Sequence, residues 1–248
     1  MNNPMDVTNK CIIVTGAGSG IGREPTRVLT GLGALVIGMD VNAEGLEETA
    51  VLGGEKCHPL TFDLTDADAV AEAVSQIVER YDKLDGLVHC AGISSRKPLN
   101  VLSKSGFSKV MDINFYSFVE LVKQCTKKRH INDGASIVAM SSISSIKGYK
   151  AKTEYCVSKA ALDAFVRCAA LELAPRKIRV NSVMAAEVLT PLALKAREMN
   201  VIVGASDFEA PLGPSEPCEV ANTIAFLLSD ATKTITGTSL LIDGGATI

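Results

Sequence analysis

The sequence predicts an α/β fold in which a doubly wound parallel sheet of about seven strands is flanked by helices. Short apolar segments alternate with longer amphipathic ones along the chain. The apolar segments are hydrophobic at consecutive positions, a pattern typical of strands that are buried on both faces of a parallel sheet. With 248 residues and no repeat or linker, the chain fits one domain of this kind better than two smaller ones. We therefore expect a single domain over residues 1–248.

The expected elements follow from this alternation. The strand-like segments are residues 11–15, 34–40, 56–63, 84–90, 135–140, 178–184 and 239–243. Segments with the helical spacing of apolar residues predict helices at 21–32, 43–51, 66–81, 105–128, 154–173 and 217–229. The longest stretch without clear periodicity is 185–216, and an irregular insert of this length is typically a lid or binding loop. We expect it to be the substrate loop.

The composition argues against several classes of protein. The net charge of −3 is unlike the basic footprint of proteins that bind nucleic acid. The seven cysteines include no CxxC pair, and the three histidines lack the spacing of metal ligands, so we expect no metal site. Scattered cysteines without a disulfide framework favour the reducing cytoplasm. The N-terminus has no apolar targeting segment and no apolar run approaches membrane-spanning length, so we expect no membrane partner.

A glycine-rich segment, TGAGSGIG at 15–22, follows the first strand directly and opens the first helix. Glycines let the backbone turn sharply and approach a pyrophosphate, whose charge is attracted by the free amides at the start of a helix. A glycine-rich turn without a ligand is the alternative. The position between the first strand and the first helix of an alternating chain favours a dinucleotide site.

The second strand ends in Asp40, about twenty residues beyond the glycines. A carboxylate at this place can accept hydrogen bonds from the ribose hydroxyls, and it would repel a 2′-phosphate, so NAD(H) is favoured over NADP(H). Two alternatives stay open. Asp40 could be a helix N-cap before Asn42, and Arg23 in the first helix could soften the repulsion of a 2′-phosphate.

The segment TEYCVSKAALDAF at 153–165 puts Tyr155 and Lys159 four positions apart, so both lie on one face of the predicted helix. The simple alternative is a helix that carries one aromatic residue and one solvated lysine. A free phenol has a pKa near ~10, and a neighbouring ammonium favours the phenolate and lowers that value. The pair is therefore a candidate general acid/base.

These features, over essentially the whole chain, make it resemble the short-chain dehydrogenase/reductase family. The TGxxxGxG motif of the family appears here as TGAGSGIG, and its Tyr-x-x-x-Lys pair appears as Tyr155 and Lys159. Ser142 lies thirteen residues before the tyrosine, Asn114 stands in the helical MDINFYS, and IRVNSV (178–183) and IDGG (242–245) match nearer the C-terminus. The resemblance implies a single Rossmann-type domain that interconverts a secondary alcohol and a ketone by hydride transfer with a nicotinamide cofactor.

The resemblance also implies the roles of four residues. Tyr155 would be the general acid/base, and Lys159 would lower its pKa and bind the nicotinamide ribose. Ser142 would position the substrate oxygen, whereas its neighbours Ser141, Ser144 and Ser145 are expected to be loop capping groups. Asn114 would hold a water that links Lys159 to solvent.

The same resemblance implies the cofactor contacts. Asp63 and Leu64 would meet the adenine, and Thr190 would bind the carboxamide. Besides Tyr155 and Lys159, the full set implied is Gly16, Gly18, Ser19, Gly20, Ile21, Gly22, Asp40, Asp63, Leu64, Ala91, Gly92 and Thr190.

Two positions depart from the family pattern. His89-Cys90 replaces the customary Asn-Asn after the fourth strand, and we expect the loss of the side chain that ties neighbouring strands together to loosen the site. Ala185-Ala186 replaces the usual Pro-Gly after the sixth strand, which puts the geometry around Thr190 in doubt.

The substrate is not predicted beyond a small alcohol or ketone. The segment KKRH (127–130) is similar to that of the 3-oxoacyl carrier-protein reductases of the family, which bind an acidic carrier, although a charge run is usually a solvated face. Lysines at 147–152 leave an anionic substrate open. The small residues of 156–170 predict a homotetramer or homodimer through helices 105–128 and 154–173. A catalytically silent NAD-binding protein is the alternative from another functional class.

Overall fold

A computed structural model describes residues 3, 5–190, 193–194 and 210–248, and its seven strands form one parallel sheet. The strand order is β3-β2-β1-β4-β5-β6-β7, so the order reverses between β1 and β4. In open α/β sheets, ligands bind at such a reversal, beyond the carboxyl ends of the strands. The strands are β1 (Cys11–Thr15), β2 (Leu35–Asp40), β3 (Cys57–Thr61), β4 (Leu84–His89), β5 (Ile131–Ser142), β6 (Arg179–Ala185) and β7 (Ser239–Ile242).

All seven expected strands are confirmed, and β5 is longer than predicted. Its first residue, Ile131, stands opposite Leu84 at the beginning of β4, and the register shifts before Gly86 pairs with Ser136. The apolar pattern could not reveal this part of the strand because residues 132–134 are exposed and polar.

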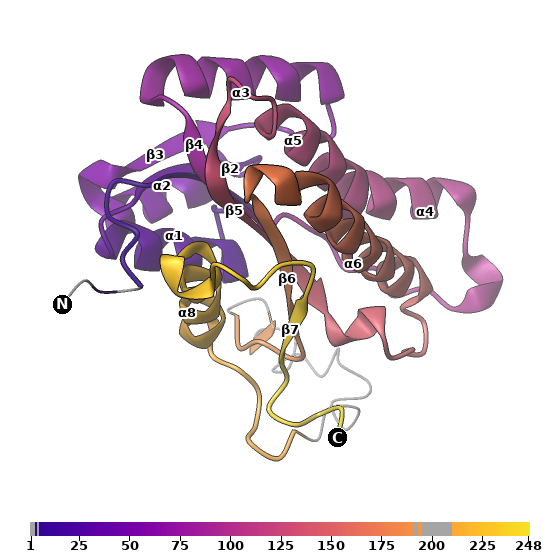
Figure 1. Cartoon of the computed structure of the whole chain (residues 1–248). Coiled ribbons are helices and arrows are strands. Elements are labelled where there is room, and N and C mark those ends of the chain that lie inside the picture. Colours follow the sequence, from indigo (N-terminus) through magenta and orange to yellow (C-terminus); the bar gives the residue numbers. More distant parts are fainter. Residues whose placement is uncertain (1–2, 4, 191–192, 195–209) are drawn as a thin grey trace.

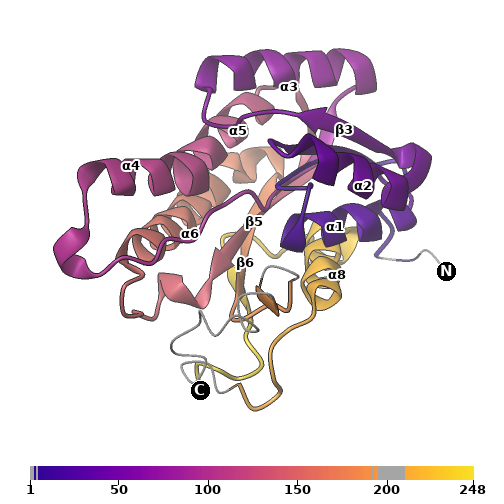
Figure 2. The same cartoon turned by 180° about the vertical axis from the view of Figure 1, so that it is seen from behind.

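Helices cover both faces of the sheet, as predicted (Figures 1 and 2). On one face α1 packs against α2 and α8, and on the other α3 packs against α5 and α4 against α6. None of the helices in the described part of the chain combines the length and apolar character that a membrane crossing needs. The helices are α1 (Gly20–Gly31), α2 (Ala43–Gly53), α3 (Ala67–Tyr81), α4 (Lys104–Met111), α5 (Ser117–Cys125), α6 (Thr153–Leu173) and α8 (Pro217–Leu228).

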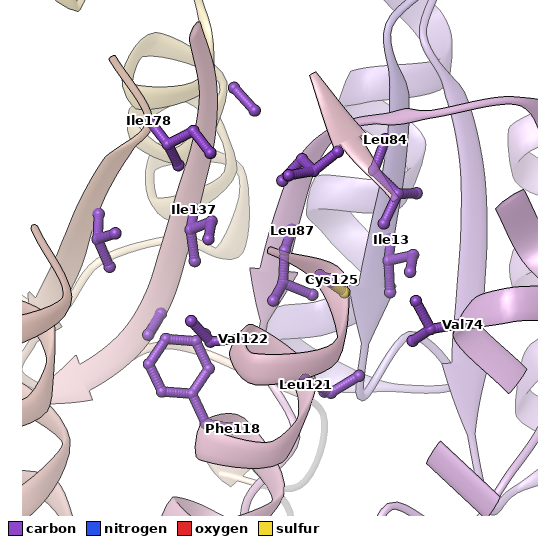
Figure 3. Packing of buried hydrophobic residues seen from close by; sticks show 14 of the residues in the cluster. Ile13, Val74, Leu84, Leu87, Phe118, Leu121, Val122, Cys125, Ile137 and Ile178 are labelled. Atoms are coloured by element: carbon purple, nitrogen blue, oxygen red, sulfur yellow. The ribbon is translucent and has the colours of Figure 1, made fainter. Parts of the chain in front are cut away.

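The core beneath α5 anchors the central strands. Phe118 and Leu121 of α5 are fully buried against the sheet, beside Ile13 of β1, Leu87 of β4 and Ile137 of β5 (Figure 3). Each such side chain contributes about 1.5–3 kcal/mol through burial. The ends of β1, β4 and β5 are therefore held by packing on the face opposite to α1.

The single helix predicted over 105–128 is wrong. The segment consists of α4, a π-helical turn at Asp112–Tyr116 and α5, which ends at Cys125. A π turn inserts an extra residue into the helix, and such turns occur frequently at functional sites. Here it contains Asn114, whose side chain is fully buried.

Candidate functional site

A cleft of about 1430 Å³ lies beyond the carboxyl ends of the strands, at the reversal between β1 and β4. Gly18 is not among its lining residues, because it lies behind the carboxylate of Asp40. Of the other residues expected to bind the cofactor, Tyr155 and Lys159 are not among the lining residues either, whereas the following are: Gly16, Ser19, Gly20, Ile21, Gly22, Asp40, Asp63, Leu64, Ala91, Gly92 and Thr190.

The glycine loop is shaped by backbone contacts that leave no room for side chains. Gly16 has a φ of +68°, and a Cβ there would lie 2.8 Å from the backbone nitrogen of Ala91. The following helix begins at Gly20, and its N-cap residue Ser19 makes no side-chain capping bond. The first amides of α1 therefore face the cleft without a capping group, which suits an anion such as a pyrophosphate.

Asp40 joins the end of β2 to this loop. One carboxylate oxygen accepts a hydrogen bond from the Gly18 amide at 2.9 Å and the other from the Asn42 amide at 3.0 Å. The N-cap of α2 is Asn42, whose side chain accepts from the Gly45 amide at 3.1 Å. The interpretation of Asp40 as the helix cap is therefore wrong, and its half-buried carboxylate lines the cleft.

Arg23 also lines the cleft, but its polar atoms are largely engaged within the protein. Its Nη2 donates to the carbonyl of Gly18 at 2.6 Å and to the carboxylate of Glu48 at 2.7 Å. Its Nε donates to the Thr49 hydroxyl at 3.1 Å. Arg23 thus bridges α1 to α2, and its charge is partly neutralised by Glu48.

Asp63 and Thr190 both line the cleft. The sequence predicts Asp63 at the end of the third strand. In the structure β3 ends at Thr61, so Asp63 lies in the segment that follows the strand. Its carboxylate accepts bonds from the amide and hydroxyl of Thr65, which hold its pKa below the ordinary value. The Thr190 hydroxyl accepts from the Ala193 amide at 3.2 Å, and its methyl group faces Gly20.

Tyr155, Lys159 and Ser142 meet where β5 faces α6. The Lys159 ammonium is buried and donates to the carbonyl of Met140 at 2.7 Å, while lying 5.8 Å from the centre of the Tyr155 ring. Ser142 ends β5 and makes a side-chain hydrogen bond with Tyr155. Lys159 is not solvated, so the simple alternative for this helix does not hold.

The pKa of Tyr155 differs from the sequence-based expectation. Burial raises it above the ordinary value, and the hydrogen bond from Ser142 only partly opposes that effect. Burial also lowers the pKa of Lys159 to about 8. In the chain by itself, desolvation therefore outweighs the expected stabilisation of the phenolate by the ammonium, which is directed to the Met140 carbonyl.

Asn114 links the π turn to the segment after β4. Its amide nitrogen donates to the carbonyl of Ile93 and to the Ser158 hydroxyl, both at 3.0 Å, and its oxygen accepts from the Ile93 amide at 2.7 Å. Both amide protons are used, so a water relay at this residue has to use other atoms. Gly92 lines the cleft beside it, and a Cβ on Gly92 would lie 3.3 Å from Asn114 Oδ1 and 3.6 Å from Lys159 Nζ.

Neither departure from the family pattern opens the structure. Nδ1 of His89 is hydrogen-bonded to the Thr15 hydroxyl at 3.0 Å and its ring stacks on Phe118, so β4 and β1 stay tied. The expected loosening at His89-Cys90 is therefore wrong. Ala185 continues β6, and the Ala186 amide donates to the Ile242 carbonyl at 3.1 Å.

Several residues of the site escaped sequence reasoning. Two buried carboxylates flank Tyr155 and Lys159 on α6: Glu154, which accepts from Ser95 and pairs with Lys97 at 3.5 Å, and Asp163. The sequence did carry a signal for both: Glu154 lies one residue before Tyr155, and Asp163 lies four residues after Lys159 on the same predicted helix. One polar face of α4 and the π turn also lines the cleft, and its alternating spacing of one and three residues is helical: Lys104, Ser105, Ser108, Lys109 and Asp112.

Within the described residues, no group of three or more His, Cys, Asp or Glu side chains could hold a metal ion. Of the expected substrate loop, residues 191–192 and 195–209 lie outside the described part of the chain. The described remainder of that segment includes Val188, which pairs with Ser215 in an isolated parallel bridge.

Comparisons with known proteins agree with this architecture. A family model described as Enoyl-(Acyl carrier protein) reductase matches residues 16–247. An NAD-dependent glycerol dehydrogenase of Listeria innocua is 30% identical over 98% of this chain and 96% of its own, and a 3-oxoacyl-(acyl-carrier-protein) reductase of Thermotoga maritima is 34% identical over 98% and 100%. A crystal structure of carveol dehydrogenase from Mycobacterium avium in complex with NAD superposes with a TM-score of 0.89 at 27% identity, covering 97% of this chain and 98% of the other. The chain therefore belongs to the short-chain dehydrogenase/reductase family, whose members are oxidoreductases acting on CH–OH groups.

Proposed function

We propose that the protein interconverts a secondary alcohol and a ketone, with NAD(H) as the hydride carrier and Tyr155 as the general acid/base. The observation that carries the proposal is the meeting of Tyr155, Ser142 and Lys159, with Lys159 beside Gly92, which lines the same cleft as the glycine loop and Asp40. The nicotinamide supplies or accepts the hydride, and the protein has to orient the substrate and move one proton.

In this proposal each residue acts through a contact that it already makes or can make. Ser142 donates a hydrogen bond to the substrate oxygen. Tyr155 donates its proton to the ketone oxygen in reduction and, as a phenolate, accepts the hydroxyl proton of the alcohol in oxidation. Lys159 holds the ribose of the cofactor and stabilises the phenolate once that forms. Asn114 holds the segment after β4 in register with α6 through Ile93 and Ser158.

The preference for NAD(H) rests on Asp40 and Arg23. The Asp40 carboxylate lines the cleft and would repel a 2′-phosphate. Arg23 is the cation that could have softened this repulsion, and its Nη2 and Nε are occupied by Gly18, Gly45, Glu48 and Thr49. We propose that Asp63 and Leu64 bind the adenine and that Thr190 binds the carboxamide.

A reductase that acts on 3-oxoacyl groups of a carrier protein is the second candidate. It is favoured by the 34% identity to the Thermotoga maritima enzyme and by the exposed cations Lys127, Lys128 and Arg129 after α5. The preference for NAD(H) that we propose from Asp40 is not enough to distinguish these two candidate functions. A substrate assay is therefore needed to choose between them.

The assay follows absorbance of the reduced nicotinamide. The purified protein is incubated with NAD⁺ or NADP⁺ and secondary alcohols that include glycerol and carveol, and with NADH or NADPH and ketones that include a 3-oxoacyl thioester. We expect turnover with NAD(H) and at least one alcohol–ketone pair. Binding of NADH without turnover of any substrate would contradict the proposal and favour a catalytically silent protein.

We also propose that residues 1–248 act as one domain, in the cytoplasm, as a homotetramer or homodimer. All seven cysteines are free thiols, which suits a reducing compartment. The outer face of α6 exposes Val157 and Leu171 between small residues, and Leu171 is 79% exposed. Light scattering of the protein and of Leu171→Asp tests this interface, and an unchanged mass of the variant would contradict it.

A further inference from the structure

Asp163 is a buried carboxylate two helical turns after Tyr155 and one turn after Lys159. Only 4% of the residue is exposed. Its oxygens accept hydrogen bonds from Ser141 of β5 at 2.8 Å and from Ser182 of β6 at 2.7 Å. The Ser182 hydroxyl also contacts Ser239 of β7 at 2.8 Å, so one carboxylate joins α6 to three strands.

Ser141 therefore does not act as the loop capping group that the sequence predicted, because it lies within β5 and binds Asp163. Three consecutive positions of β5 then face three residues of α6. The carbonyl of Met140 binds Lys159, Ser141 binds Asp163, and Ser142 binds Tyr155. A movement of Ser141 would displace both neighbours.

The two serine hydroxyls are neutral, so they satisfy the hydrogen bonds of Asp163 without balancing its charge. A buried charge is costly unless an opposite charge lies nearby. Residues four apart on a helix are neighbours on one face, and Lys159 stands one turn before Asp163. It is also buried, with 4% exposure, so each of these charges lies where the other can compensate it.

The other titratable groups around Lys159 carry no negative charge at neutral pH. His89 on β4 has a pKa lowered to about 3 by burial, so it is a neutral imidazole. Burial raises the pKa of Cys90, after β4, to about 12, so it is a thiol. The pKa of Tyr155 is raised as well. Cys90 and then Asp163 act against burial and raise the pKa of Lys159. Because Cys90 is a thiol at neutral pH, Asp163 is the carboxylate that these groups offer to the ammonium.

We propose that Asp163 is a positioning residue of the proton-transfer site: its charge keeps the Lys159 ammonium protonated, and its two serine bonds hold the end of β5 against α6. This rests on the proposed function insofar as Tyr155 and Lys159 carry the proton transfer. The electrostatic coupling of Asp163 to Lys159 itself does not depend on the substrate or the reaction.

Two variants separate charge from structure. Asp163→Asn keeps the size and hydrogen-bonding capacity of the side chain but removes the charge. Ser182→Ala keeps the charge and removes one hydrogen bond. In the wild-type protein we expect an alkaline limb of kcat/KM near pH 8, where Lys159 loses its proton. Asp163→Asn should move this limb down by about one pH unit, and Ser182→Ala should lower Tm and leave the limb in place.

A second readout does not need turnover. With ¹³Cε-labelled lysine, NMR follows the titration of Lys159, which is assigned by its loss in Lys159→Met. The Lys159 midpoint should fall by about one unit in Asp163→Asn and stay unchanged in Ser182→Ala. If the wild-type protein turns over no substrate but the midpoint still shifts, the proposed function fails and the coupling stands. Equal midpoints in wild type and Asp163→Asn would overturn the inference.

If Asp163→Asn does not fold, the double variant Asp163→Asn/Lys159→Met removes both charges together. Under the proposal it folds, because neither charge is left buried without the other. A double variant that also fails to fold would mean that Asp163 is a structural residue only, and it would overturn the electrostatic role.

Discussion

The cofactor side of the cleft is built mainly from backbone, whereas the chemical side is built from buried side chains. Around residues 16–22 the shape comes from glycines, and the amides at the start of α1 have no side-chain cap. Around β5 and α6, by contrast, Lys159, Asp163 and Asn114 are all buried and bonded to other protein groups. A change on the cofactor side should therefore act on shape and binding, and one on the chemical side on proton transfer and pKa.

Tyr155→Phe should distinguish the two sides most clearly, because it should lower turnover and leave NADH binding nearly unchanged. Because only the hydroxyl is lost, turnover should fall by about 10³-fold or more, in the upper range for a general acid/base. The Kd of NADH, measured by fluorescence, should change by no more than about twofold, since an isosteric ring keeps the packing. Tyr81→Phe on α3 is the control and should leave both quantities unchanged. A Tyr155→Phe protein with a tenth of the normal turnover would contradict the role.

Gly16→Ala tests the backbone character of the cofactor side. A Cβ at this position meets the backbone of Ala91, and the φ of +68° is unfavourable for alanine. NADH affinity should fall by at least about tenfold, and the free energy of unfolding by about 1–3 kcal/mol. Gly54→Ala is a matched control, because Gly54 has a φ of +63° with open space around it. Urea titration should show the backbone cost there, about 1–3 kcal/mol, while NADH affinity stays unchanged. Equal effects of the two variants would show that the contact with Ala91 is unimportant.

Asp40→Ala should alter cofactor choice without altering the chemistry. Removing the carboxylate removes its repulsion of a 2′-phosphate, and the ratio of kcat/KM for NAD⁺ over NADP⁺ should fall by about 10- to 100-fold. Glu44→Ala is the control, since Glu44 is an exposed acid in the first turn of α2. An unchanged ratio would mean that Asp40 serves only the amides of Gly18 and Asn42.

The last effect concerns the pH dependence of stability at His89, which lies between the two sides. Its folded pKa of about 3 is below the ordinary 6.5, so between these values the unfolded chain binds a proton that the folded chain does not. Stability is then lost as the pH falls from about 6.5 toward about 3, with a slope near 1.4 kcal/mol per pH unit. His89→Asn should remove that slope in urea unfolding across the window. An equal slope in wild type and His89→Asn would contradict the assignment. His58 has a partly exposed ring, and burial lowers its pKa in the same direction, so His58→Asn should remove a smaller part of the slope.

The difference between the two sides also explains what could be predicted. The glycine loop and Asp40 are read from spacing, because backbone shape at a strand–helix junction depends on local sequence. The roles of Ser141 and Asp163 depend on which strands lie beside α6, and the local sequence around these residues does not reveal those neighbours. The resemblance identified Asn114 as a site residue. It did not predict the π turn that contains Asn114 or the hydrogen bonds of Asn114 to Ile93 and Ser158.

By itself the sequence determined the class of fold, its seven strands and most of the cleft residues around the glycine loop and Asp40, because periodicity and motif spacing are properties of contiguous segments. Only the tertiary structure decided the state of the groups that would carry the chemistry. Burial raises the pKa of Tyr155 and lowers that of Lys159, and Asp163 opposes the second effect while it binds Ser141 of β5 and Ser182 of β6. Desolvation and charge coupling depend on everything that surrounds a group, and the neighbours that surround α6 come from strands distant in the chain.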